Sequence, residues 1–107
     1  MIGYNEIEAN ALFEMMASKK ILLVDVRNDD EVARGIIPGA LHVPLAMLPV
    51  KFESLNNDDT LVFYCHSGVR SGQAAAFVAG KGRKQVFNLR GGVLAWGKAG
   101  YPFGPKG

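Results

Sequence analysis

The only cysteine of this chain, Cys65, stands where nucleophilic chemistry is expected. It follows an apolar run, residues 61–64, and precedes a short loop with Gly68 at its centre and then a helix-like segment from Ser71. Such a loop can turn successive backbone N–H groups inward, and the start of a helix adds positive potential. Both effects favour a thiolate and so lower the pKa of a cysteine. The pattern therefore predicts a nucleophilic sulfur that can hold an anion or a further sulfur atom.

The polar residues around Cys65 admit more than one role. His66 is either a general base or a wall of the loop that faces substrate, and the second is favoured because adjacent side chains usually diverge. Arg70 either binds an anion or pairs with an acid. Asp25, at the end of a neighbouring strand, is expected to accept hydrogen bonds from the cysteine loop, and His42 to be structural. The alternative for Cys65 itself is an inert buried thiol, which is common.

The composition is that of one folded domain. The chain has 107 residues, of which 49% are hydrophobic and 21% charged, so it can bury a core. No apolar run approaches the roughly 18 residues of a membrane helix, and the N-terminus lacks the basic and apolar stretches of a signal peptide. We interpret residues 1–107 as a single cytoplasmic domain.

Charge is distributed unevenly along the chain. All ten acidic residues lie between Glu6 and Asp59, with five bases, whereas the part from Thr60 onward has seven bases and no acid. A site built from the second part lies in positive potential, which suits a small anionic substrate. The bases form no dense run, so nucleic acid is not expected as a partner. One cysteine and two histidines are too few ligands for a structural metal site, and a lone cysteine fits a reducing compartment.

Strand-like and helix-like segments alternate along the chain. Strands are expected at 21–25, 41–43, 60–64 and 85–87, and helices at 5–18, from 28 to a stop at Gly35, 71–79 and 93–98, with helical turns and loop over 45–57. The alternation predicts an α/β fold with a mainly parallel central sheet of about five strands and helices on both faces. Ligands bind at the carboxyl ends of such strands, so Asp25, Cys65 and Phe87 are expected to gather at one edge.

Several motifs, taken in order, resemble those of the rhodanese-like sulfurtransferases in their single-domain form. The matching segments are 25–27 with Glu31, 35–40 with 43–44, the loop 65–71, and 89–92 with Trp96, Gly100 and Pro102. Each motif is weak alone, but the ordered set covers nearly the whole chain, from about residue 4 to residue 103, and the resemblance implies that the core of the domain lies there. The resemblance implies a rhodanese-like α/β domain.

The resemblance also implies a sulfurtransferase that works through a Cys65 persulfide. Thiosulfate or another persulfide donor would leave its sulfane sulfur on Cys65, and a thiol, or cyanide in an assay, would remove it. A sulfur-relay protein is a further candidate partner, and no metal, other cofactor or membrane is implied. The implied substrate-binding loop is His66, Ser67, Gly68, Val69, Arg70 and Ser71, supported by Asp25, Arg27 and Arg90.

Three positions depart from the family pattern. Ile36 stands where the family often has His, a position expected to be structural. His66 stands where many thiosulfate-using members have Arg, and Glu31 where two-domain enzymes carry a substrate-binding Arg. Glu31 is expected instead to pair with Arg27 across one helical turn.

Two other functions are alternatives to sulfur transfer. One is a non-catalytic rhodanese-like regulatory or protein-binding module, against which the intact Cys65 and Gly68 argue. The other is a phosphatase or arsenate reductase-like enzyme. Four residues lie between Cys65 and Arg70, one fewer than those enzymes usually carry. The shorter loop should fit a single sulfur better than a tetrahedral oxyanion.

Overall fold

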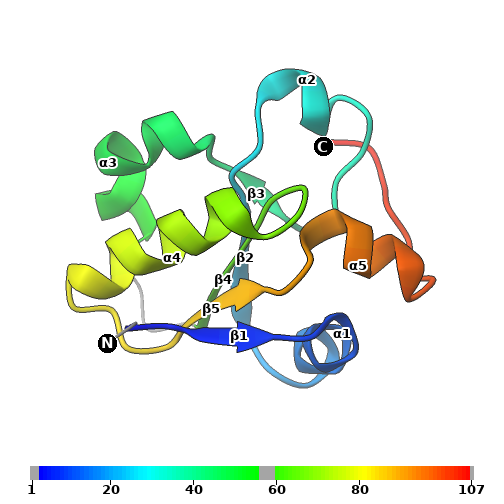
Figure 1. Ribbon diagram of the computed structural model, residues 1–107, viewed down its shortest axis with the longest axis horizontal. Coiled ribbons are helices and arrows are strands. Elements are labelled where there is room, and N and C mark those ends of the chain that lie inside the picture. The colour runs from blue at the N-terminus through cyan, green and yellow to red at the C-terminus, as the bar shows by residue number, and fades with distance from the viewer. Residues whose placement is uncertain (1–2, 56–59, 107) are drawn as a thin grey trace.

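The computed structural model describes residues 3–55 and 60–106, and Asn56 and Asn57 of the predicted 45–57 segment lie outside these ranges. The described residues form a five-stranded sheet in the order β1-β5-β4-β2-β3, with every neighbouring pair parallel (Figure 1). The strands are β1 (Asn5–Ile7), β2 (Ile21–Asp25), β3 (Leu41–His42), β4 (Thr60–Tyr64) and β5 (Val86–Leu89). The predicted parallel α/β sheet is confirmed.

Helices cover both faces of this sheet. They are α1 (Ala9–Ser18), α2 (Asp29–Val32), α3 (Leu48–Lys51), α4 (Val69–Gly80) and α5 (Gly92–Lys98), with 3-10 turns η1 (Leu45–Met47) and η2 (Phe52–Leu55). α1 and α5 pack on one face, and α3 and α4 on the other (Figure 1). Within the described ranges, no helix is long and apolar enough to cross a membrane.

The central position of β4 in the sheet explains why polar and apolar residues do not alternate along this strand. All five of its residues are buried. Leu61 and Phe63 pack in the core beneath α3 and α4, whereas Val62 and Tyr64 pack in the core beneath α1 and α5. A parallel strand covered on both faces reads as a continuous apolar run. Cys65 continues this alternation and falls on the α4 side.

The first helix begins later than predicted. Asn5, expected to cap that helix, instead lies in β1, where it is paired with Phe87 of β5. Ile7 pairs with Leu89, and the Ile7 carbonyl accepts a hydrogen bond from the Arg90 N–H at 2.9 Å. The open edge of β5 offers backbone hydrogen bonds that a local helical pattern does not reveal. The prediction of a helix from Asn5 was therefore wrong for its first turn.

The segment after β2 folds as predicted, with a short helix after Asn28. The Asn28 N–H donates to the Glu31 carboxylate at 3.0 Å, so the acid reaches back to the start of α2. This is the backward half of a capping box. It holds Glu31 at the carboxyl edge of the sheet, close to the start of α4.

Candidate active site

Cys65 lies directly after β4, and the loop that follows turns N–H groups towards its sulfur. The Gly68 N–H donates to Sγ at 3.1 Å, and Ser71 Oγ lies 3.4 Å from Sγ. Gly68 has φ +103°, a left-handed conformation that glycine adopts readily. Burial raises the pKa of the Cys65 thiol, but the Ser71 hydroxyl and the backbone N–H groups of Ser71, Gly68 and Ser67 outweigh it, so the pKa is lowered. The donors of the loop thus favour the thiolate form of this buried cysteine.

The start of α5 supports this loop from behind. The Val93 N–H donates to the Cys65 carbonyl at 2.9 Å, and the Leu94 N–H to the His66 carbonyl at 3.3 Å. A Cβ on Gly92 would lie 2.4 Å from the Cys65 carbonyl oxygen and 2.5 Å from that of His66. Only glycine allows the helix to begin this close to the loop.

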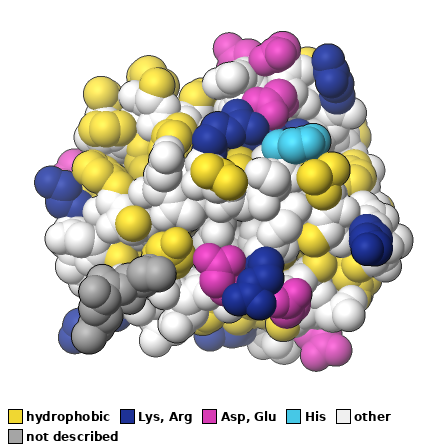
Figure 2. Space-filling model, in the orientation of Figure 1, with side chains coloured by type: hydrophobic (Ala, Val, Ile, Leu, Met, Phe, Trp, Pro, Cys, Tyr) yellow, Lys and Arg dark blue, Asp and Glu magenta, His cyan; other side chains and the backbone are white. Residues whose placement is uncertain are grey.

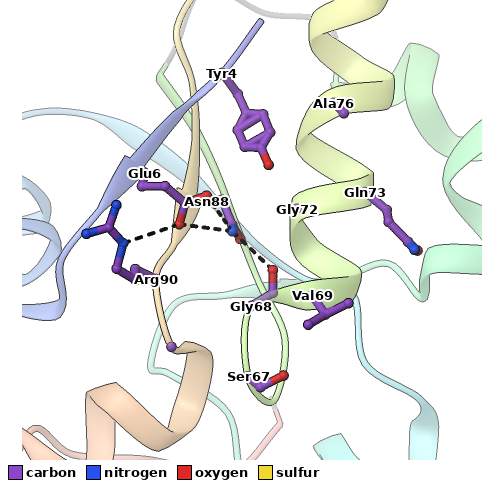
Figure 3. Close-up of a pocket in the computed structure, with 11 residues that line it drawn as sticks. Tyr4, Glu6, Ser67, Gly68, Val69, Gly72, Gln73, Ala76, Asn88 and Arg90 are labelled. Carbon is purple, nitrogen blue, oxygen red and sulfur yellow. Dashed lines mark hydrogen bonds and ion pairs between the residues drawn. The ribbon is translucent and has the colours of Figure 1, made fainter. Parts of the chain in front are cut away.

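Asn88, in β5, is a buried polar residue of the site that the sequence analysis missed. Its Oδ1 lies 2.5 Å from Ser71 Oγ, and its Nδ2 donates to the Gly68 carbonyl at 3.1 Å. Nδ2 also donates to the Glu6 carboxylate, at 3.1 Å from Oε2 (Figure 3). The sequence feature that could have identified Asn88 is a single amide side chain within the apolar run 86–89. Asn88 ties β1, β5 and the cysteine loop together.

One cavity opens above the loop towards α2, and we call it the α2-side cavity. It has a volume of about 430 Å³ and is lined by Arg27, Glu31, Arg34, His66, Ser67, Arg70 and Val93. Figure 2 shows basic and acidic side chains beside a histidine on this surface. The site residues that meet here are thus Arg27, His66, Ser67 and Arg70, whereas the Val69 side chain is exposed.

Glu31 and Arg70 form a two-pronged ion pair across this cavity. Arg70 Nη1 lies 2.7 Å from Glu31 Oε1, and Nη2 lies 2.8 Å from Oε2. The hydrogen bond to Arg70 is the main reason that the pKa of Glu31 falls to about 2, and the same bond raises the pKa of Arg70. Arg70 thus pairs with an acid, which is one of its two predicted roles, and it also interacts with Cys65. Its other predicted role, anion binding, stays a prediction. The predicted pairing of Glu31 with Arg27 was wrong.

Arg27 is held by another carboxylate. Asp25 is fully buried, and it accepts hydrogen bonds from the Arg27 N–H at 2.9 Å, Nε at 3.0 Å and Nη2 at 2.7 Å. Arg27 Nη2 also donates to the Gly35 carbonyl at 2.8 Å. The Asp25 carboxylate therefore binds Arg27. The expectation that it accepts hydrogen bonds from the cysteine loop was wrong. His42 has the predicted structural role, with Nε2 2.8 Å from the Arg27 carbonyl oxygen.

Arg90 lies on the other side of the loop, at a second cavity. This β1-side cavity has a volume of about 510 Å³, and its walls include Tyr4, Glu6, Gly68, Asn88 and Arg90 (Figure 3). Arg90 is largely exposed and donates to the Glu8 carboxylate at 2.9 Å. It therefore does not line the α2-side cavity, where His66 and Arg70 lie.

The chain is similar to known proteins along most of its length. The profile of the rhodanese-like domain matches residues 8–99. The chain belongs to the rhodanese-like domain family. A sulfurtransferase of Allochromatium vinosum is 41% identical over 105 residues, covering 96% of this chain and 98% of that protein. The thiosulfate sulfurtransferase GlpE of Coxiella burnetii is 30% identical and covers 92% of each chain. A rhodanese-related protein of Thermoplasma volcanium has a similar structure, with TM-score 0.88, 28% identity and coverage of 96% and 100%.

Proposed function

We propose that this rhodanese-like domain, residues 1–107, is a cytoplasmic sulfurtransferase that carries sulfane sulfur as a persulfide on Cys65. The observation that carries the proposal is the set of donors around the sulfur, with the Gly68 N–H 3.1 Å from Sγ and Ser71 Oγ 3.4 Å from it. These donors lower the pKa of Cys65 and keep a thiolate ready for attack. The lone thiol of the chain fits a reducing compartment.

The reaction runs in two displacements at sulfur. The Cys65 thiolate attacks the outer sulfur of thiosulfate, whose S–S bond breaks so that its electron pair leaves with sulfite. The new S–S bond joins Sγ to the transferred sulfur, which now carries the negative charge among the N–H groups of residues 66–71. A thiolate acceptor, or cyanide, then attacks this outer sulfur, and Sγ leaves as a thiolate. Atoms and charge balance without any cofactor.

The charges of the α2-side cavity bear on the sulfur donor. Arg70 is neutralised by Glu31 and Arg27 by Asp25, both at 2.7 Å. The cavity therefore holds less net positive charge than its arginines alone would supply. This supports donors that carry little negative charge at the reacting end, such as a small persulfide or the persulfide of a sulfur-relay protein, at least as well as thiosulfate, a dianion.

Mass spectrometry of the intact protein tests the proposal. After incubation with thiosulfate or glutathione persulfide, we expect a mass gain of about 32 Da, one sulfur atom, which cyanide removes. The Cys65→Ser variant should gain nothing. If the unmodified chain gains no sulfur from either donor, the proposal is wrong.

The two alternatives find less support in the geometry. A phosphatase or arsenate reductase needs a loop that encloses a tetrahedral oxyanion, but only four residues separate Cys65 from Arg70, and the guanidinium is bound to Glu31. A non-catalytic module has no need of a cysteine whose pKa is lowered by three loop N–H groups and a hydroxyl.

A further inference from the structure

The carboxamide of Asn88 can be oriented in only one way. Its Nδ2 lies 3.1 Å from the Gly68 carbonyl oxygen and 3.1 Å from Glu6 Oε2, and both atoms only accept hydrogen bonds. The two hydrogens on Nδ2 serve these two acceptors, which leaves Oδ1 facing Ser71 Oγ at 2.5 Å. Because Oδ1 carries no hydrogen, the hydrogen in that contact belongs to the Ser71 hydroxyl.

Ser71 therefore has two acceptors for a single hydrogen. Its Oγ lies 2.5 Å from Asn88 Oδ1 and 3.4 Å from Cys65 Sγ. A neutral Cys65 thiol does not need that hydrogen, since its own S–H can donate to Oγ. A thiolate does need it, because hydrogen bonds to a charged acceptor are roughly twice as strong as neutral ones. The charge on Sγ therefore decides whether the Ser71 hydroxyl donates its hydrogen to Asn88 Oδ1 or to Cys65 Sγ.

We propose that Asn88 is a positioning residue that acts on Cys65 through Ser71, holding the hydroxyl hydrogen while Sγ is uncharged and yielding it when the thiolate forms. The inference rests on the proposed function, because only sulfur transfer cycles Sγ between thiolate and persulfide. In the persulfide the negative charge lies on the outer sulfur and Sγ is neutral, so the hydroxyl returns to Asn88. Competition from Asn88 also limits the stabilisation of the thiolate, and a less stabilised thiolate is a stronger nucleophile.

Several charged groups surround the loop, and Arg70 among them interacts with Cys65 itself. These groups come from several elements and form three ion pairs, which are Arg70 with Glu31, Arg27 with Asp25, and Arg90 with Glu6. None of them is changed in the variants below. A shift in the titration of Cys65 that requires the Ser71 hydroxyl therefore reports the competition with Asn88.

The test is the rate of iodoacetamide alkylation against pH, which reports Cys65 alone because the chain has one cysteine. The variants are Ser71→Ala, Asn88→Leu and the double variant. We expect Ser71→Ala to raise the midpoint by about one pH unit, and Asn88→Leu to lower it by up to about one unit. In the Ser71→Ala background, Asn88→Leu should have no effect. The control Gln73→Leu makes the same change on another wall residue of the β1-side cavity and should not move the midpoint.

Three outcomes would overturn the proposal. A midpoint in Asn88→Leu equal to or above that of the unmodified chain overturns it, as does an equal shift with and without the Ser71 hydroxyl. Should Asn88→Leu fail to fold, Asn88→Asp replaces it, because a carboxylate holds the hydrogen more tightly. That variant should raise the midpoint more with Ser71 present than in Ser71→Ala, and equal shifts overturn the proposal.

The same measurements separate this inference from the proposed function. Coupling between Asn88 and Ser71 in the alkylation profile supports the positioning role whether or not the chain accepts sulfur. A mass gain at Cys65 without such coupling supports sulfur transfer and refutes the role of Asn88.

Discussion

Replacing Gly92 by alanine tests how far the geometry of Cys65 depends on the start of α5. The added Cβ would lie 2.4 Å from the Cys65 carbonyl oxygen and 2.5 Å from that of His66, at φ +57°. The left-handed conformation costs a residue with a side chain about 1–2 kcal/mol. The overlap with backbone atoms adds about 1–3 kcal/mol, because the loop or the helix must move. We therefore expect the free energy of unfolding to fall by about 2–5 kcal/mol.

Urea unfolding, followed by the fluorescence of the single tryptophan, measures this loss. The matched control is Gly100→Ala, since Gly100 has φ +85° but a Cβ there meets nothing within 4 Å. That control should lose only the conformational cost, about 1–2 kcal/mol. In Gly92→Ala the alkylation midpoint of Cys65 should also rise, because the loop N–H groups move away from the sulfur. Equal stability losses in the two variants, with an unchanged alkylation profile, would refute this reasoning.

Three further predictions concern charged groups near the loop. Because the pKa of Glu31 falls from 4.5 to about 2, its bond to Arg70 stabilises the fold above pH 4.5 and is lost as the pH falls through about 2. The urea midpoint should drop over this range, and Glu31→Gln should flatten the drop; an unchanged slope would contradict the pairing. Asp25→Asn should cost about 3–5 kcal/mol in urea unfolding, since it leaves the buried Arg27 charge without its carboxylate. His66→Arg adds a permanent charge to the α2-side cavity, so the KM for thiosulfate should fall at low salt and the difference should shrink at high salt; no change at low salt would count against this cavity as the donor site.

Local patterns account for the parts of the fold and site that could be predicted. The apolar run of β4, the glycine of the loop and the helix after it are neighbours in sequence, so backbone preference and burial act on them directly. The capping contact of Glu31 with Asn28 spans three residues and is equally local. These segments were predicted with boundaries that differ from the structure by a few residues at most.

Competing partners that the fold buries or brings together explain where prediction failed. Arg27 was expected to pair with Glu31 one turn away, but the fully buried Asp25 takes its guanidinium. Asn5 was expected to cap a helix, but the free edge of β5 takes its backbone into the sheet. In both cases the local pattern was compatible with the predicted partner. In the folded protein, burial of Asp25 and pairing with β5 favoured a different partner.

The amino-acid sequence by itself determined that a lone cysteine would follow a buried parallel strand, enter a glycine-bearing loop and precede a helix, because those relations depend on adjacent residues. Only the tertiary structure decided which distant side chains surround that cysteine. Arg70 meets Glu31 across 39 residues, and Asn88 meets Glu6 across 82. The strand order β1-β5-β4 brings Glu6, Asn88 and the loop together, and hydrogen-bond partners are chosen by this proximity and by burial rather than by spacing along the chain.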